Sequence, residues 1–405
     1  MPMPSQRKPS LGYVFATTFA DVVGYGLMIP VLPRLLASLT GSDIGTAALY
    51  GGSLAFAYAI VQVFFAPLLG NLGDRFGRRP VLVVSLLPMG IDALLLAFAP
   101  SVGWLYVGKM IGGTVGGSYG VASAYLADCT PPDKRSRAFG IINAAAGAGI
   151  IVGPVIGGLL SKYDPLLPCY VASALSVANI IYAILFVPES LGRGHRRPFE
   201  WKRANPVGTV LSLRKNRIIR GLVIAMGFFY IASDAIEGVW PYFTTEKFGW
   251  TEEQTGWSLG VMGSLFALVQ GVICPMVLPR LGKRRGIFLG LIIQAAAFVG
   301  FAFACRVWMI YALMVPYAVG TIFGPAIQSA MANRTPETGQ GELQGGLSAL
   351  RNITSVIGPP AMAWLFAFFT RAGASVYFPG MPFLLGAVMI VAALLVVNRY
   401  LPTND

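Results

Sequence analysis

Residues 64–86 read FFAPLLGNLGDRFGRRPVLVVSL, and this stretch decides the fold. Its centre, GNLGDRFGRRP at 70–80, is polar and basic, whereas the chain on both sides continues as long apolar runs. An apolar run of about 20 residues is long enough to cross the hydrocarbon core of a bilayer as a helix. The stretch therefore predicts two membrane-spanning helices joined by a tight basic loop.

The composition extends this pattern to the whole chain. Of its 405 residues, 55% are hydrophobic and only 12% are charged, and the mean hydropathy is +0.67. Soluble domains carry about a quarter charged residues, so a soluble protein is excluded, and short connections leave no room for large extramembrane domains. Apolar runs bounded by charges and turn residues predict twelve spans: 11–33, 46–70, 79–99, 102–126, 138–160, 168–188, 218–241, 254–279, 285–304, 306–330, 341–369 and 376–400.

The basic residues are distributed unevenly between the two sets of loops. Of the 30 Lys and Arg residues, 23 lie at the termini and in the loops on the same predicted side, and five lie in the opposite loops. Under the positive-inside rule this asymmetry predicts that both termini are cytoplasmic. The net charge of +13 thus follows from basic loops on one side of a lipid bilayer. Nucleic acid is not an expected partner.

A long basic segment divides the spans six and six. It predicts an N-terminal six-helix bundle at 1–190, a cytoplasmic linker at 191–217 and a C-terminal six-helix bundle at 218–405. A shift of 205 residues aligns ADCTPP at 127 with ANRTPE at 332, and GIIVGPVIGG at 149 with TSVIGPPAMA at 354. We interpret this as a duplication, although helix-compatible composition is an alternative. The expected fold is all-α integral membrane, with twelve transmembrane helices in two pseudo-symmetric bundles around a central site.

The loop at 70–80 is too specific to be only a positive-inside anchor, which would explain its arginines but not its glycines or its acid. Glycine allows a tight reversal between helices, and Asp74 is expected to cap a helix N-terminus. Arg78 is expected to pair with Asp128 at the same membrane face. The predicted cytoplasmic gate consists of Gly70, Gly73, Asp74, Arg75, Gly77, Arg78, Arg79 and Asp128.

Several ionisable residues fall inside predicted spans, where they are costly and by default functional. Asp21, near the middle of the first span, is expected to be a proton or substrate site; the alternative is an acid held by hydrogen bonds to neighbouring helices. Asp92 is similar but lies nearer the outer end of its span. Lys109 either pairs permanently with an acid such as Asp21 or Asp92, or takes part in proton exchange.

Asp234 and Glu237 lie three residues apart in the seventh span, so they share one helix face. Two neighbouring carboxylates in a low dielectric resist ionising together, which favours proton uptake by one of them. If the pair instead lies solvated at the outer rim beside Trp240 and Pro241, it has no special role. Arg351, inside the eleventh span, is expected to pair with an acid or to attract an anionic substrate.

Other chemistry is poorly supported by the sequence. His195 is the single histidine, and Cys129, Cys169, Cys274 and Cys305 are scattered, so we expect neither a metal site nor a disulfide framework nor an enzyme. The stretch GWLYVGKM at 103–110 lacks the hydroxyl residue that ends a phosphate-binding loop. ATP binding is therefore not expected.

The loop at 70–80 and GIIVGPVIGG at 149–158 resemble the signature loop and the antiporter motif of the major facilitator superfamily. Within it, FADVVGYGLMIPVLPRLL at 19–36 and FGIINAAAGAGIIVGPVIGG at 139–158 resemble the tetracycline/proton antiporters. The resemblance implies a twelve-helix exporter of the bacterial inner membrane that exchanges a drug for protons by alternating access. In the antiporter motif it implies a seam that controls bending and leakage, at Gly149, Gly153, Pro154, Gly157 and Gly158.

One position departs from that family. Gln294, in the ninth predicted span, stands where the tetracycline exporters carry an acid, which places their proton-coupling scheme and tetracycline itself in doubt. Asp234 and Glu237 are candidate substitutes. Aromatic residues are candidates for lining an amphipathic drug cavity: Tyr25, Tyr58, Tyr119, Phe228, Phe229, Tyr230, Trp240 and Phe323.

Together these features predict proton-coupled efflux of a small amphipathic organic compound, tetracycline-like or multidrug, by a monomer that uses the proton gradient and no cofactor. The nearest alternative is a facilitator of a sugar, a carboxylate or another metabolite, including a symporter. A channel or a non-transporting receptor is a third class, but the loops are too short for a signalling domain.

Overall fold

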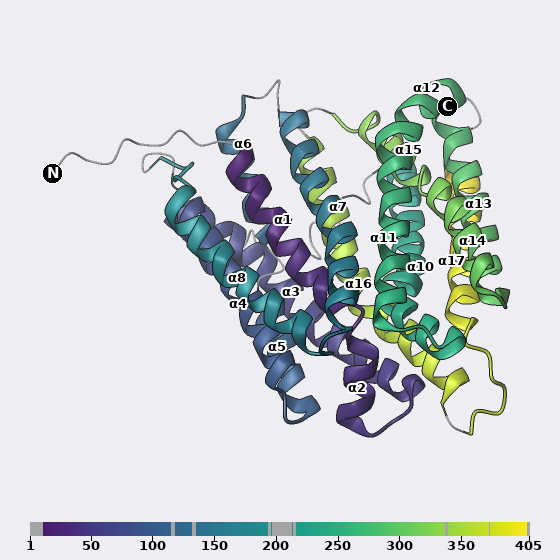
Figure 1. The fold of residues 1–405 in the computed structure, drawn as a ribbon. Coiled ribbons are helices and arrows are strands. Elements are labelled where there is room, and N and C mark those ends of the chain that lie inside the picture. The colour runs from purple at the N-terminus through teal and green to yellow at the C-terminus, as the bar shows by residue number, and fades with distance from the viewer. Residues whose placement is uncertain are drawn as a thin grey trace. The chain divides into compact units, whose positions relative to one another are not determined.

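The computed structural model describes residues 11–114, 118–131, 135–192, 196, 213, 216–336, 339–371 and 373–402, and the regular structure in these ranges is helical (Figure 1). Eleven helical segments in them are long and apolar enough to span a membrane. The fourth predicted span is described as two helices of 12 residues, α5 (Val102–Gly113) and α6 (Ser118–Cys129), each too short for a full crossing. The prediction of an all-α, multi-pass membrane protein is confirmed.

The chain forms two compact units, which we describe separately. Unit 1 comprises Met1–Val31 and Ile60–Asn205, and unit 2 comprises Leu32–Ala59 and Pro206–Asp405. The segment 32–59, which the sequence assigned to the first bundle, thus packs with the second unit. Most of the predicted linker at 191–217 lies outside the described residues.

Unit 1 holds the first half of the chain except for the segment that joins unit 2. Its shared core consists of apolar side chains from several helices, among them Val14, Leu82, Tyr125, Ile142 and Ala183, each at most 2% exposed. The helices are α1 (Leu11–Met28), the second half of α3 (Ile44–Phe76), α4 (Arg78–Phe98), α5, α6, α7 (Arg135–Leu160) and α8 (Leu167–Phe186).

The closest packing in unit 1 lies between α1 and α7, which run alongside each other (Figure 1). A methyl group at Gly153 would lie 2.8 Å from Cα of Gly26, and one at Gly149 would lie 2.8 Å from Cβ of Val22. Gly157 lies against the carbonyl group of Leu27. Because helices in lipid associate through van der Waals contact, small residues let these two backbones approach.

Unit 2 has an aromatic core around Trp240. The rings of Phe301 and Phe383 pack edge-on to it, with centroids 5.3 and 6.2 Å away, and its indole N–H donates to Ser258 Oγ at 3.0 Å. The helices are α2 (Leu32–Thr40), the first half of α3, α10 (Arg217–Phe248), α11 (Glu252–Leu268), the π-helical turn η5 (Val269–Ile273), α12 (Cys274–Leu281), α13 (Lys283–Phe303), α14 (Val307–Gly320), α15 (Phe323–Ala332), α16 (Gln340–Thr370) and α17 (Met381–Tyr400).

Glycines explain why the first half of α3 packs so tightly on unit 2. Gly52 lies against Ala363 and Pro360 of α16, and a methyl group at Gly51 would lie 2.7 Å from Cζ of Tyr242 in α10. The preceding helix α2 makes a contact of its own, since its Arg34 pairs with Glu252 of α11 at 3.4 Å. This part of the chain is therefore held by close backbone packing and an ion pair.

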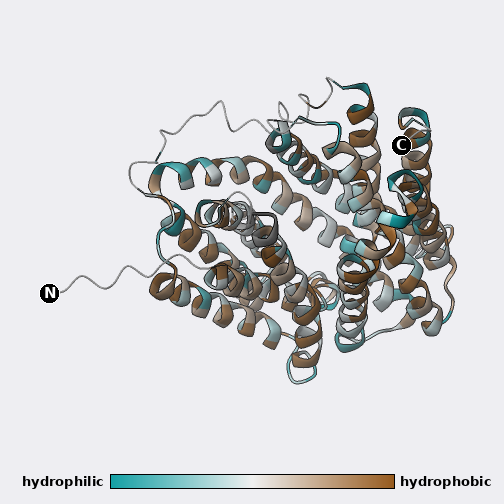
Figure 2. Cartoon of the chain, turned by 90° about the horizontal axis from the view of Figure 1, so that it is seen from above, coloured by the Kyte–Doolittle hydropathy of each residue, from teal (hydrophilic) through white to brown (hydrophobic). Residues whose placement is uncertain are grey.

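Large apolar side chains remain on the outside of both units. Phe64 and Phe98 in unit 1, and Trp308 and Leu395 in unit 2, are each 64 to 67% exposed. Hydrophobic residues cover much of the helices of both parts in Figure 2. Such surfaces are typical of helices whose outer faces contact lipid.

The internal repeat is also visible in the bounds of two helices, outside the sequence motifs that first indicated it. Helices α4 and α13 both contain 21 residues, and the shift of 205 maps Arg78–Phe98 directly onto Lys283–Phe303. Each is preceded by a glycine with positive φ, Gly77 at 108° and Gly282 at 81°. In this conformation glycine is strongly favoured, so the two units build the same reversal in the same way.

Candidate functional site

The loop at 70–80 forms an ion-pair cluster in unit 1. Nη2 of Arg78 lies 2.7 Å from Oδ1 of Asp74, and its Nε donates to Oδ2 of Asp128 at 2.9 Å. The Arg78 side chain is only 11% exposed, so charge-assisted hydrogen bonds replace most of its hydration. One guanidinium thus ties the end of α3 to the end of α6.

The cap of α4 comes from a residue that the sequence analysis missed. Oε1 of Glu189 accepts from the backbone N–H groups of Arg78 at 2.8 Å and of Ser190 and Leu191 at 3.0 Å. A carboxylate at a helix N-terminus satisfies orphan donors and interacts well with the helix dipole. The expectation that Asp74 caps a helix N-terminus is wrong, because Asp74 lies in the last turn of α3.

The remaining motif residues have supporting positions. Gly73 leaves space for the Arg78 side chain, since a methyl group there would lie 3.0 Å from Nη1. Arg79 donates to the carbonyl of Ile184 at 2.5 Å. Arg75 is exposed beside the ring of Phe76, and a methyl group at Gly70 would meet no atom within 4 Å. Only part of the motif is therefore fixed by contacts, and the cluster of Asp74, Arg78, Asp128 and Glu189 is its ordered centre.

A second charged pair is buried within unit 1. Nζ of Lys109 on α5 lies 2.6 Å from Oδ2 of Asp92 on α4, and their side chains are 11% and 3% exposed. A methyl group at Gly108 would lie 2.8 Å from Asp92 Oδ1, so this glycine permits the close approach. Tyr25 and Cys169 are the other ionisable groups near Lys109. Of the acids suggested by the sequence, the structure pairs Lys109 with Asp92.

Asp21 and Tyr25 lie one turn apart on α1, next to the residues that pack against α7. Asp21 is half-buried and Tyr25 is 47% exposed, in contrast to the buried Val23, Gly24 and Gly26. These two polar side chains therefore share the more open face of α1. The side chain of Tyr119, another candidate, lies outside the described part of the chain.

Unit 2 contains a charged triad formed by Asp234, Glu237 and Arg351. Nη1 of Arg351 on α16 donates to Oδ1 of Asp234 at 3.1 Å, and its Nη2 donates to Oε2 of Glu237 at 2.5 Å. The Tyr230 ring lies beside the guanidinium, 5.3 Å from Cζ. Arg351 is thus positioned by two carboxylates and an aromatic ring from consecutive turns of α10.

The two acids of the triad have different surroundings. The Asp234 side chain is 1% exposed, and Gly358 of α16 lies directly against its carboxylate, whereas the Glu237 side chain is 61% exposed. Trp240 and Pro241 are buried rather than at a solvated rim. With two carboxylates and one guanidinium, the triad carries one excess negative charge when both acids are ionised.

Glu237 opens into a cavity of about 360 Å³ that lies within unit 2. Three aromatic rings line it together with several side chains that can form hydrogen bonds, and Gln270 belongs to the π-helical turn η5, a feature frequent at functional sites. Of the aromatic candidates, Phe229 lines this cavity. Its described lining is Phe229, Ser233, Ile236, Glu237, Phe266, Gln270, Tyr317, Thr321, Gly324, Pro325 and Gln328.

Gln294 is buried at another place in unit 2. Its side chain on α13 is 1% exposed and lies against Gly320 of α14, where a methyl group would be 2.9 Å from its Cβ. Neither of its amide heteroatoms has a hydrogen-bond partner among the described residues. Gln294 therefore makes no hydrogen bond to the triad.

A helical membrane protein with ion pairs inside its apolar helices and a cavity of mixed aromatic and polar lining has the features of a solute transporter. Comparison with known proteins agrees. A family model of the Major Facilitator Superfamily matches residues 14–236 and 222–405. The chain therefore belongs to the Major Facilitator Superfamily.

Individual relatives and solved structures are also similar to this chain. A tetracycline resistance protein, class C, from Escherichia coli is 36% identical over 386 residues, covering 95% of this chain and 96% of that protein. The class G protein from Vibrio anguillarum is 33% identical, with coverage of 95% and 96%. A crystal structure of the human organic anion transporter MFSD10 (TETRAN) gives a TM-score of 0.72 at 20% identity, over 98% of this chain and 100% of that chain. The resemblance drawn from the sequence motifs is confirmed.

Proposed function

We propose that the protein exports a small amphipathic organic compound, tetracycline-like in character, in exchange for protons. The observation that carries this proposal is the triad, where an exposed carboxylate that pairs with a guanidinium lines an aromatic cavity. Similarity to tetracycline resistance proteins over nearly the whole chain supports a drug as substrate. The proton gradient supplies the energy, without ATP, and a single chain is the functional unit.

The proposed setting is the bacterial inner membrane, with both termini in the cytoplasm. The charge asymmetry of the loops supports this orientation. Two six-helix bundles, proposed at 1–190 and 218–405, alternate in exposing a central site to the two faces, with the segment 32–59 of the first packed against unit 2. The linker at 191–217 then lies on the cytoplasmic side.

Proton exchange in this proposal depends on carboxylates that can face water in one state. Asp21, on the more open face of α1, and Glu237, in the unit 2 cavity, are both accessible enough to exchange protons. Asp234 is buried beside Arg351 and fixes that side chain, so Glu237 is the member of the triad that competes for proton and substrate. Gln294 cannot ionise and has no part in the coupling.

Protonation from outside neutralises such a carboxylate and weakens its hold on the substrate. Reopening to the cytoplasm, where the proton concentration is lower, releases the proton and restores the negative charge. Differential binding of substrate to the two protonation states is what couples the flows.

The ion-pair cluster of Asp74, Arg78, Asp128 and Glu189 stabilises the cytoplasmic closure. Its contacts join three helix ends within unit 1, so their rearrangement provides a two-state element. The glycine seam between α1 and α7 keeps Asp21 on a helix whose position is tightly fixed. Both features favour discrete rather than continuous movement.

Transport by proteoliposomes with an imposed pH gradient tests this proposal. Tetracycline taken up against its gradient when the lumen is acidic, and not when both sides have equal pH, is the expected result for exchange. Uptake stimulated by a proton gradient of the opposite direction would indicate symport and contradict it. A panel of sugars and carboxylates, run in the same vesicles, provides the comparison with metabolite transport.

A further inference from the structure

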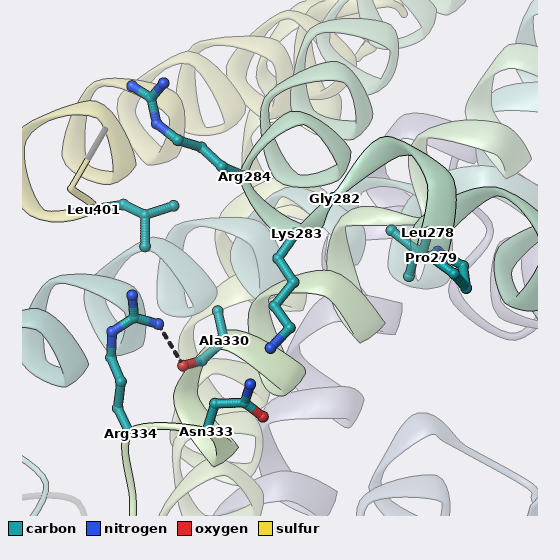
Figure 3. Close-up of a pocket in the computed structure, with 9 residues that line it drawn as sticks. All are labelled: Leu278, Pro279, Gly282, Lys283, Arg284, Ala330, Asn333, Arg334 and Leu401. Carbon is teal, nitrogen blue, oxygen red and sulfur yellow. Dashed lines mark hydrogen bonds between the residues drawn. The ribbon is translucent and has the colours of Figure 1, made fainter. Parts of the chain in front are cut away.

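A second cavity, of about 500 Å³, lies at the ends of four helices of unit 2 (Figure 3), and none of the triad residues lines it. It is lined by the C-terminal end of α12, the first turn of α13, the end of α15 and the residue that follows α17. The lining residues are Leu278, Pro279, Gly282, Lys283, Arg284, Ala330, Asn333, Arg334 and Leu401.

Three of these residues are basic and none of the described lining residues is acidic. The Lys283 ammonium lies beside the Asn333 amide, whose oxygen accepts from it when the amide is turned to face Lys283, so its partner is a neutral group. The Arg284 guanidinium lies 5.0 Å from the centroid of the Phe288 ring, and its buried Nε has no hydrogen-bond partner in the described part of the chain. Arg334 already donates to the Ala330 carbonyl at 2.8 Å, so the inference rests on Lys283 and Arg284.

The internal repeat shows what is unusual about this cavity. The shift of 205 residues maps Arg78 of the ion-pair cluster onto Lys283, and it maps Asp74 and Asp128 onto Pro279 and Asn333. Unit 1 thus neutralises its cation with carboxylates at 2.7 and 2.9 Å. Unit 2 has a cation at the equivalent position, Lys283, at the start of α13. The positions equivalent to the two acids hold the uncharged residues Pro279 and Asn333.

We propose that this cavity binds a phosphate group, which supplies the negative charge that the carboxylates provide in unit 1. Ammonium and guanidinium groups both bind phosphate well. The site also includes the first turn of the 21-residue helix α13, which follows Gly282, and helix N-termini favour anions.

The phosphate can belong to an anionic lipid headgroup or to a free ion in solution. Leu278, Pro279 and Leu401 provide apolar walls in a site at the ends of membrane-spanning helices, as suits the glycerol and upper acyl region of a lipid. Leu401 lines the same cavity as Arg284 and Arg334 (Figure 3), so the lining combines apolar and basic groups. These features favour phosphatidylglycerol as the probe.

Native mass spectrometry of the full chain in detergent, titrated with phosphatidylglycerol or with phosphatidylcholine, tests the site directly. We expect tighter binding of phosphatidylglycerol, and we expect the double variant K283Q/R284Q to weaken it at least a hundredfold, beyond the roughly 25-fold that the general effect of two basic residues would give. R285Q is the matched control, because exposed Arg285 adjoins the pair but does not line the cavity. It should weaken binding no more than about fivefold, the general effect of one basic residue near an anionic surface.

A second variant reproduces the unit 1 arrangement. N333D places a carboxylate beside Lys283 with almost no change in volume, and it should also weaken phosphatidylglycerol binding at least tenfold while the protein stays folded. Displacement of the lipid by millimolar inorganic phosphate would assign the site to the free ion, and no displacement would assign it to the lipid headgroup. If K283Q/R284Q binds phosphatidylglycerol as R285Q does, or if N333D binds it as the wild type does, the proposal is wrong.

Discussion

Replacement of Arg351 is the sharpest test of the charged triad. Arg351→Met removes the guanidinium that pairs with Asp234, and it leaves a carboxylate whose side chain is 1% exposed. Breaking a buried ion pair by removing one partner destabilises proteins by about 3–5 kcal/mol, because the remaining charge is uncompensated. We therefore expect the free energy of unfolding of R351M to fall by about that amount.

Two matched variants separate charge from packing. In E237Q the lost pair involves a side chain that is 61% exposed, and such pairs contribute about 0.2–1 kcal/mol. In the double variant D234N/R351M the buried charge disappears together with its partner, so most of the lost stability should return. The expected order of stability is wild type, E237Q, then the double variant, with R351M lowest.

Unfolding of purified protein in mixed micelles, followed by tryptophan fluorescence over a titration with denaturing detergent, measures all four proteins under the same conditions. The comparison of R351M with D234N/R351M isolates the cost of the unpaired carboxylate. If the double variant were less stable than R351M, or if R351M equalled the wild type, Arg351 would not be holding Asp234 in the way described.

Three further predictions concern unit 1. Gly153→Ala should lower the free energy of unfolding by about 1–3 kcal/mol through overpacking and should slow transport. Gly147→Ala, whose added methyl meets no atom within 4 Å, should do neither. Equal transport rates for the two variants would exclude a role for the glycine seam between α1 and α7. Glu189→Gln should lower the thermal unfolding temperature and weaken the cap of α4 by about 1 kcal/mol, and an unchanged temperature would contradict that cap. Lys109→Met should destabilise by about 3–5 kcal/mol, with most of the loss restored in D92N/K109M, and failure of this rescue in thermal unfolding would argue against the pair.

The membrane spans could be predicted from the sequence because the length of an apolar run is a local property of the chain. It could not show which helices become neighbours, such as the packing of the segment 32–59 with unit 2. The close contacts of Gly45, Gly51 and Gly52 with residues far along the chain explain that packing. Small residues in an apolar run look alike whether they face lipid or another helix.

The partners of charged residues could likewise be predicted only in part from the sequence. Arg78 was expected to pair with Asp128, and the structure has that pair, because both residues fell at ends of spans on one predicted face. Glu189 also follows the end of a span on that face, which was the available signal, but a loop acid carries no pattern that distinguishes a cap from a solvated charge. Arg351 was expected to pair with some acid, and only the three-dimensional packing of α16 on α10 selects Asp234 and Glu237.

The most direct measurement of the central claim is proton release on substrate binding. Purified protein in weakly buffered detergent solution is mixed with tetracycline, and a pH indicator records protons released per substrate bound. The account predicts proton release by the wild type and less release by D21N and by E237Q, at tetracycline concentrations that saturate each variant. Saturating tetracycline binding to the wild type with no proton released at any pH between the acid and neutral ranges would contradict proton exchange at these carboxylates.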